Sequence, residues 1–372
     1  MTKKLICQFS HSSHRYEIEI GHQLLQSQLS YLSSISSTFA IITDDKVAPL
    51  YAETLIQSLS SFNLNAYLFS FPSGEQHKTR ETKERLENQL FEKQLGRDTC
   101  VIALGGGVVS DMAGYLAATY CRGVPFVSIP TSLLGMVDAS IGGKTGVNVP
   151  FGKNMIGCFY QPHKVVIDLS TLQTLAKKER ANGFVEMIKH GLIASAQEFE
   201  NLEKQADQLL ALDSLLLEKA VFESCKIKKE IVEEDEKENG KRHLLNFGHT
   251  IGHALEQLTD YSLPHGEAVA IGLVVESYLS LKLGLLDQHS FDRIKRILIQ
   301  YGLPFQLPSQ FSIQALLNAM TLDKKSIKKT PRFVKIHAIG APFIKDEKFC
   351  THVDHSLLEE ALKWMNHDLC CH

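Results

Sequence analysis

The stretch VIALGGGVVSDMAGYLAA, residues 101–118, decides the fold class of this chain. A short apolar run, three consecutive glycines and an apolar helical pattern predict a strand, a tight turn and a helix in succession. Glycines in such a turn let backbone N–H groups approach a phosphate, and the N-terminus of the following helix favours negative charge. Gly105 and Gly107 suit a dinucleotide fingerprint, but Ser110 stands where its third glycine belongs. The motif therefore indicates either a nucleotide site or only a tight strand-to-helix turn.

The residues on either side of this stretch continue the alternation of strand and helix. Short apolar runs predict strands, and longer periodic stretches predict helices. The strands are expected at 39–43, 65–69, 99–104, 126–129 and 165–168, and the helices at 46–59, 79–95 and 108–121. After about Ala176 the pattern changes to long amphipathic helices, which continue to His337. We therefore expect an α/β N-terminal domain with a parallel Rossmann-like sheet, residues 1–176, and a mostly α-helical C-terminal domain, residues 177–372.

Composition and charge exclude several classes of protein. With 372 residues, of which 44% are apolar and 22% charged, the chain can bury one or two substantial cores. The net charge of −3 argues against a nucleic-acid-binding surface. The N-terminus shows no leader pattern and no apolar run could span a bilayer, so we expect a cytosolic protein without a membrane partner. The eight cysteines show no CxxC spacing, which favours reduced thiols.

Three histidines and a glutamate indicate a metal site in the second half of the chain. His249 and His253, in LNFGHTIGHALE, share one face of a predicted helix, and His265 opens another apolar helix at LPHGEAVAIG. Glu186 lies in the apolar run GFVEMIKHGLI, where a buried carboxylate needs a partner. An exposed ion pair between Glu186 and Lys189 is the alternative. A carboxylate with two or three histidines and open coordination positions suits a catalytic zinc better than a structural one.

Glycine, lysine and asparagine gather in the segment between the two predicted domains, residues 124–162. Glycines with interspersed lysines make an anion-binding surface without a fixed fold of their own, so we expect this segment to be rich in loops. The cations and amides beside the glycine-rich and histidine-rich motifs are Arg122, Lys144, Lys153, Asn154, Lys189, Lys228, Arg242, Asn246, Lys324 and Lys325. Each alone could be a solvated surface residue, but their clustering indicates a small, multiply anionic substrate. Asp44 and Glu75, at strand ends, could accept hydrogen bonds from ribose hydroxyls.

These motifs, taken in order, resemble the 3-dehydroquinate synthase family of the sugar-phosphate cyclases. The matching stretches are SGEQHK, GGGVVSD, RGVPFVSIPTSLLGMVDASIGGKTGVN, GKNMIG, ERANGFVEMIKHG, EDEKENGKRHLLNFGHTIGHALE, HGEAVAIG and LDKKS, in family order between Asp44 and Lys325. Val185 and His190 depart locally from the family, which more often carries alanine and tyrosine at these positions.

The resemblance implies an enzyme that converts 3-deoxy-D-arabino-heptulosonate 7-phosphate to 3-dehydroquinate and phosphate, the second step of the shikimate pathway. It implies NAD as a cofactor that oxidises a ring hydroxyl and returns the hydride after phosphate is eliminated, so that net redox is zero. Ring opening and an intramolecular aldol closure complete the reaction. It also implies Zn²⁺, or Co²⁺ in its place, as a Lewis acid, and a homodimer.

The resemblance further implies roles for individual residues. The metal ligands would be Glu186, His249 and His265, while His253 would lie near the substrate phosphate and relay protons. That phosphate would be held by Lys144, Asn154, Lys324 or Lys325, and Arg122 from the neighbouring subunit. Lys228 and Arg242 would face the substrate carboxylate, and Asp138, Lys189 and Asn246 would contact ring hydroxyls. The NAD-binding positions would be Asp44, Glu75, Lys78, Gly106, Gly107, Val108, Asp111, Thr131, Ser132, Lys153, Thr174 and Leu175.

Three other functions need to be weighed against this one. A sister cyclase acting on sedoheptulose 7-phosphate or glucose 6-phosphate would share fold, NAD and zinc, but its substrates lack a carboxylate, and the presence of Lys228, Arg242 and Asn246 favours the acid. A metal-dependent polyol dehydrogenase would release NADH and would not explain the lysines of GGKTGVN, GKN and LDKKS. A non-enzymatic nucleotide-binding module would leave the histidines and lysines without a purpose.

Overall fold

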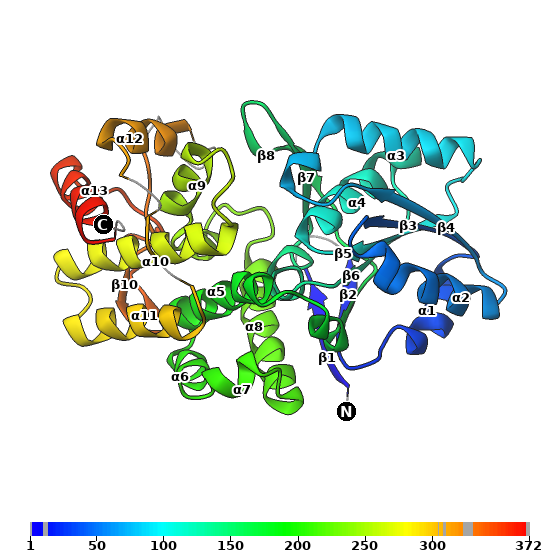
Figure 1. The fold of residues 1–372 in the computed structure, drawn as a ribbon, viewed down its shortest axis with the longest axis horizontal. Helices are drawn as coiled ribbons and strands as arrows, with labels where there is room; N and C mark the ends of the chain where they lie inside the picture. Colours follow the sequence, from blue (N-terminus) through cyan, green and yellow to red (C-terminus); the bar gives the residue numbers. More distant parts are fainter. Residues whose placement is uncertain (1, 10–13, 304, 308–309, 323–329, 370–372) are drawn as a thin grey trace. The chain divides into compact units, whose positions relative to one another are not determined.

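The computed structural model describes residues 2–9, 14–303, 305–307, 310–322 and 330–369. The chain divides into two compact units, Met1–Ala176 and Lys177–His372 (Figure 1). Lys324 and Lys325 lie outside the described residues. Among the helices that are described, none is both long and apolar enough to cross a membrane.

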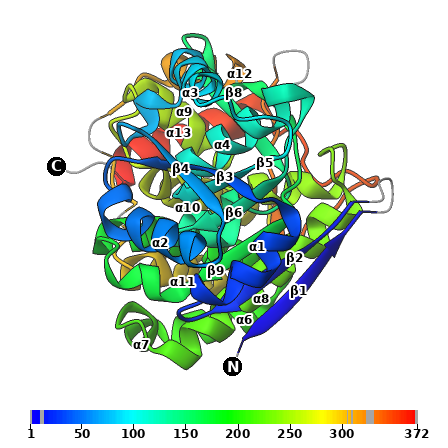
Figure 2. The same cartoon turned by 90° about the vertical axis from the view of Figure 1, so that its right-hand side faces the viewer.

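A seven-stranded sheet forms the centre of the first unit, in the order β1-β2-β9-β6-β5-β3-β4. Its strands are β1 (Lys3–Gln8), β2 (Arg15–Gly21), β3 (Thr38–Asp44), β4 (Asn65–Phe71), β5 (Thr99–Gly105), β6 (Phe126–Pro130) and β9 (Lys164–Asp168). The five strands predicted from apolar runs are present, and every pair except one is parallel. The exception is the antiparallel pair of β1 and β2, which forms a long ribbon at one edge (Figure 2). The sheet is therefore mostly parallel, not wholly parallel.

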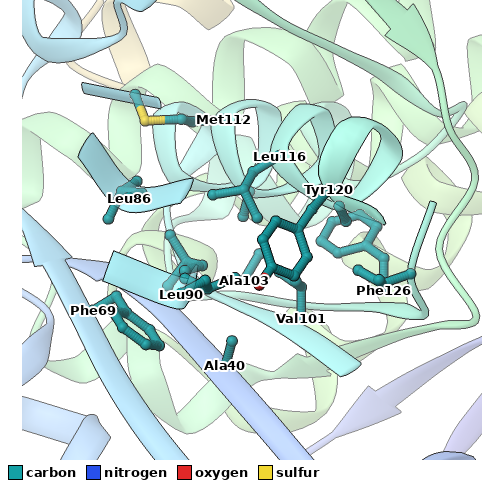
Figure 3. Packing of buried hydrophobic residues seen from close by; sticks show 14 of the residues in the cluster. Ala40, Phe69, Leu86, Leu90, Val101, Ala103, Met112, Leu116, Tyr120 and Phe126 are labelled. Atoms are coloured by element: carbon teal, nitrogen blue, oxygen red, sulfur yellow. The ribbon is translucent and has the colours of Figure 1, made fainter. Parts of the chain in front are cut away.

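Both faces of the sheet are buried along the central strands β3, β5, β6 and β9, because alternate residues of each strand point to opposite sides. In β3, Phe39 and Ile41 pack in a cluster with α1 (Leu29–Ile35) and α2 (Glu53–Ser61). Ala40 and Ile42, which alternate with Phe39 and Ile41 along the strand, pack in a second cluster on the other face. That cluster contains side chains of α3 (Arg80–Glu92) and α4 (Gly107–Thr119), and Figure 3 shows how they meet the sheet. Burial on both faces explains why the strands read as unbroken apolar runs.

The glycine-rich segment 124–162 is more ordered than we expected. After β6 it forms a π-helical turn, Gly135–Ala139, and then an antiparallel hairpin of β7 (Lys144–Val149) and β8 (Gly152–Phe159). The prediction of a segment without a fixed fold is wrong, because its glycines allow the backbones of the two strands to approach each other very closely. A Cβ atom added at Gly157 would lie 1.9 Å from the carbonyl oxygen of Thr145.

Helices dominate the second unit, as the amphipathic pattern predicts. They are α5 (Lys177–Ala194), α6 (Ala196–Lys204), α7 (Ala206–Leu210), α8 (Ser214–Glu234), α9 (His249–Leu258), α10 (His265–Lys282), α11 (Gln288–Gln300), α12 (Ile313–Leu322) and α13 (His355–Asp368). Two short strands, β10 (Ile336–Ala338) and β11 (Ala341–Pro342), pair antiparallel. Helix α10 is buried on nearly all sides, which matches its continuous apolar sequence.

Helices α9 and α10 pack unusually close together, because glycines occupy their contact. A Cβ atom added at Gly272 of α10 would lie 1.8 Å from the carbonyl oxygen of Gly248, the residue that precedes α9. Gly248 itself has φ of 78°, a left-handed conformation that glycine adopts without strain. The two helices that carry the histidines of the sequence motif therefore lie side by side.

Candidate metal and nucleotide sites

Three side chains of the second unit converge on one point. His249 and His265 are the first residues of α9 and α10, and Glu186 lies in the middle of α5 with no exposed surface. The Nε2 atom of His249 lies 3.6 Å from Oε1 of Glu186, and Nε2 of His265 lies 3.7 Å from the same oxygen. One candidate ligand atom from each residue lies within 4.8 Å of the others. These distances suit three ligands around one divalent ion.

Local structure explains how the chain brings these three residues together. Pro264 has extended backbone geometry and immediately precedes α10, so His265 projects from the very start of the helix. A Cβ atom added at Gly266 would lie 2.6 Å from Cα of Asn182, so the start of α10 lies directly against α5. The ligand set thus depends on close contacts of α10 with both α5 and α9.

The other ring nitrogen of each of these two histidines also faces an acceptor. Nδ1 of His249 lies 3.1 Å from the carbonyl oxygen of Phe247. Nδ1 of His265 lies 3.4 Å from Oε1 of Glu256, a buried residue of α9. The sequence analysis did not single out Glu256. Acceptors at Nδ1 fix the ring so that Nε2 is the nitrogen available for a metal.

Within this cluster, Lys189 forms a buried ion pair with Glu186. Burial by itself lowers the pKa of His265, but the carboxylates of Glu256 and Glu186 outweigh that effect and raise the pKa to about 10. Two carboxylates around one imidazole thus favour its protonated form in the absence of a metal, and a metal ion bound at Nε2 would displace that proton.

His253 lies beside the three candidate ligands. Its ring centroid is 5.4 Å from that of His249 and 6.5 Å from that of His265. The i, i+4 pair of the sequence motif therefore shares a helix face as predicted, but His253 is not a member of the converging set. Its half-buried ring lies at the edge of the candidate site.

The residues expected to face a carboxylate belong to α8 and to the 3-10 helix Lys241–Asn246. Lys228 of α8 and Arg242 are both buried. Arg242 donates from its guanidinium to the carbonyl oxygen of Glu236. Burial would raise the pKa of Asp235, but backbone N–H donors, including that of Arg242, hold the pKa below its usual value. The loop between α8 and this 3-10 helix, which Asp235 anchors, also contains Glu238. Glu238 accepts a hydrogen bond from Asn246 at 2.9 Å, and the sequence analysis did not single it out.

The strand-to-helix turn of the first unit has the geometry expected for a phosphate site. Gly106 caps α4 and Gly107 begins it, followed by Val108. A Cβ atom at Gly106 would lie 3.1 Å from Oγ of Ser132, so a side chain there would fill the turn. The backbone N–H of Thr131 donates to the carbonyl oxygen of Gly105 at 3.0 Å, which ties the ends of β5 and β6 together. The N–H groups at the start of α4 can receive an anion here.

Polar side chains of the 3-10 turn Glu75–His77 and its cap, of helix α4 and of the β7–β8 hairpin form a connected network. The buried ammonium of Lys78 pairs with the carboxylate of Asp111 and donates to Oδ1 of Asn154 at 2.6 Å. Burial raises the pKa of Asp111 despite the opposing effect of Lys78. Asn148, another residue that the sequence analysis did not single out, donates to Glu75 at 2.8 Å and accepts from the backbone of Asn154 at 2.9 Å. Lys153 approaches Glu75 at 4.0 Å.

The remaining predicted residues of the first unit lie on separate loops and strand ends. Asp44 accepts hydrogen bonds from the backbone N–H groups of Lys46 and Val47, both at 2.9 Å. Thr174 bonds to the hydroxyl of Tyr51 and directly precedes Leu175. Asp138 lies in the π-helical turn, Lys144 is exposed at the start of β7, and Arg122 is exposed with φ of 67°. A positive φ in a residue other than glycine is uncommon, and Arg122 is held there beside Cys121, which has φ of 49°.

Comparison with known proteins identifies relatives along nearly the whole chain. The family model described as 3-dehydroquinate synthase N-terminal matches residues 68–182, and the one described as 3-dehydroquinate synthase C-terminal matches residues 183–326. A 3-dehydroquinate synthase of Desulforamulus reducens is 45% identical over 90% of this chain and 94% of that protein.

Two solved structures share the fold at lower identity. A 2-deoxy-scyllo-inosose synthase complexed with carbaglucose-6-phosphate, NAD⁺ and Co²⁺ has a TM-score of 0.89 at 24% identity, over 97% of this chain and 99% of that one. A 2-epi-5-epi-valiolone synthase of Streptomyces hygroscopicus with NAD⁺ and Zn²⁺ bound has a TM-score of 0.87 at 27% identity, over 96% and 98% of the two chains.

Proposed function

Because the chain belongs to the 3-dehydroquinate synthase family, we propose how its own side chains carry out that family's reaction. The enzyme converts 3-deoxy-D-arabino-heptulosonate 7-phosphate to 3-dehydroquinate and phosphate in the shikimate pathway. The convergence of Glu186, His249 and His265 is the structural observation that carries the proposal, because it supplies a metal site of the kind that this chemistry requires.

We assign the metal to these three residues. One carboxylate and two Nε2 atoms suit Zn²⁺ or Co²⁺ and leave coordination positions for a substrate. When bound, the ion supplies Lewis-acid chemistry at the hydroxyl that is oxidised and at the resulting ketone. The two structural relatives have Co²⁺ or Zn²⁺ bound. The ion pair of Lys189 with Glu186 places an ammonium next to this point, where it can donate to a ring hydroxyl.

We assign NAD to the turn at Gly106 and the polar network around Lys78. When bound, NAD accepts a hydride from the substrate and returns it. The N–H groups at the start of α4 would receive the pyrophosphate, and a side chain at Gly106 would block its approach. Both structural relatives have NAD⁺ bound. The full assigned set is Asp44, Glu75, Lys78, Gly106, Gly107, Val108, Asp111, Thr131, Ser132, Lys153, Thr174 and Leu175.

We assign the charged and polar residues that bind neither the metal nor NAD to recognition of the substrate. Lys144, Asn154, one of Lys324 and Lys325, and Arg122 of the partner subunit would bind the phosphate in a homodimer. Lys228 and Arg242 would bind the carboxylate, since both are buried cations beside the loop that Asp235 anchors. Asp138 and Asn246 would orient ring hydroxyls. His253 would move a proton between the substrate and its phosphate, since its ring lies next to the ligand cluster.

Phosphate release from the heptulosonate phosphate tests this proposal directly. Purified protein with NAD and Zn²⁺ should release one phosphate per substrate consumed and form 3-dehydroquinate. A sister cyclase is the second candidate, because both solved relatives above are synthases of other cyclic products. Rapid turnover of sedoheptulose 7-phosphate, with none of the heptulosonate phosphate, would establish that second function.

A further inference from the structure

Glu256 is a buried carboxylate beside the proposed metal site that the reaction described above does not use. It lies on α9, is 1% exposed, and places Oε1 3.4 Å from Nδ1 of His265. We propose that Glu256 is a positioning residue that holds the His265 ring with Nε2 toward Glu186 and thereby sets the affinity of the metal site. This inference rests on the proposed assignment of the metal to Glu186, His249 and His265.

His265 needs such a support more than the other ligands do. Both histidines begin a helix, but the side chain of His265 is 28% exposed, against 11% for that of His249. Glu186, in contrast, is buried in the middle of a helix. An exposed first-turn side chain can adopt several rotamers, and only some of them direct Nε2 toward Glu186. The contact with Glu256 selects one of these, because it engages the opposite ring nitrogen.

The two histidine ligands are supported by acceptors of different charge. His249 faces the neutral carbonyl oxygen of Phe247, whereas His265 faces a carboxylate. A carbonyl oxygen is sufficient to orient an imidazole, so the charge of the carboxylate has an effect beyond orientation. Its negative charge makes the imidazole a stronger donor to a cation. Glu256 therefore both orients the His265 ring and strengthens the donor that its Nε2 presents to a metal.

The affinity for Zn²⁺ tests this inference without reference to activity. We would measure the Zn²⁺ dissociation constant of Glu256→Gln and Glu256→Ala by competition with a chelating indicator. Loss of an outer carboxylate typically weakens metal binding by about 10- to 100-fold. We expect Glu256→Ala in that range and a smaller loss for Glu256→Gln, whose amide oxygen can still accept from Nδ1–H. The Co²⁺ absorption spectrum of both variants should shift, because His265 would be held less firmly.

Glu267→Gln is the matched control. Glu267 lies in the first turn of α10, as His265 does, but its carboxylate pairs with Nζ of Lys178 at 2.9 Å. Its replacement removes the same charge and should leave the Zn²⁺ dissociation constant within about twofold of the parent value. If Glu267→Gln weakened binding as much as Glu256→Gln, a general field and not the His265 contact would be responsible, and the inference would be wrong.

Two further measurements separate the possible failures. Thermal unfolding at increasing Zn²⁺ concentration yields the affinity even of a variant that needs metal to fold. Parent-like affinity and Co²⁺ spectrum in both Glu256 variants, together with metal loss in Glu186→Ala, would overturn this inference and leave the metal site standing. Parent-like affinity in Glu186→Ala would instead overturn the metal site itself.

Discussion

Replacing Gly272 by alanine should separate the two helices that carry the histidines. The added Cβ atom would lie 1.8 Å from the carbonyl oxygen of Gly248, well short of the roughly 3.5 Å at which such contacts become favourable. Neither atom belongs to a flexible side chain, so the backbone of α9 or α10 must move. Overpacking of this kind costs about 1–3 kcal/mol, and contact with backbone places this case at the upper end. Alanine regains about 1 kcal/mol through its higher helix propensity. The net effect is a decrease of about 2 kcal/mol in the free energy of unfolding.

Guanidinium unfolding of the metal-free protein measures that loss, and Zn²⁺ titration measures its effect on the site. The start of α9 carries His249, so movement there should also weaken Zn²⁺ binding. Gly252→Ala is the matched control in the same helix pair, because its Cβ atom would lie 3.2 Å from the carbonyl oxygen of Ala268. A shift of a few tenths of an ångström would relieve that contact, and the helix propensity gain should offset it. Parent-like stability and Zn²⁺ affinity in Gly272→Ala would refute the reasoning, as would equal losses in the two variants.

The other predictions concern the metal, the redox cycle and the substrate. Alanine at any of the three proposed ligands should lower both metal content and rate, whereas His253→Ala should retain metal and lose turnover; elemental analysis with a rate assay checks this. The proposed ligands are Glu186, His249 and His265. NADH should not accumulate during steady turnover, which absorbance at 340 nm would follow, and stoichiometric release would point to a dehydrogenase. Arg242→Ala should lower kcat/KM for the heptulosonate phosphate at least about tenfold, the factor that 1.4 kcal/mol represents, and an unchanged value would remove Arg242 from carboxylate binding.

Much of the first unit could be predicted because its strands are buried on both faces. Continuous apolar runs such as those of β3 and β5 carry a strong local signal. The choice of partner is not a local property, and the antiparallel position of β1 depends on β2 pairing in parallel with β9. The β7–β8 hairpin was missed because glycine weakens the strand pattern, although close pairing at Gly157 requires it.

The candidate metal site shows a similar limit. Helical spacing indicates that His249 and His253 share a face, and they do. Spacing does not reveal that α5 packs against the start of α10, which is what brings Glu186 to His265 and not to His253. Glu256 gave no signal at all, because a glutamate in a helix is usually a solvated charge and its partner belongs to the next helix.

Of the three proposed ligands, Glu186 lies on α5, whereas His249 and His265 lie on the consecutive helices α9 and α10, which follow only after α6, α7 and α8. An ion bound by all three would act as a removable cross-link that closes a long loop of polypeptide. Cross-links of this kind restrict the unfolded chain more strongly as the loop lengthens. No single helix, cut out of the chain, would retain such an ion. Chelation should therefore make the segment between α5 and α10 more susceptible to proteases, since one restraint on its opening would be removed.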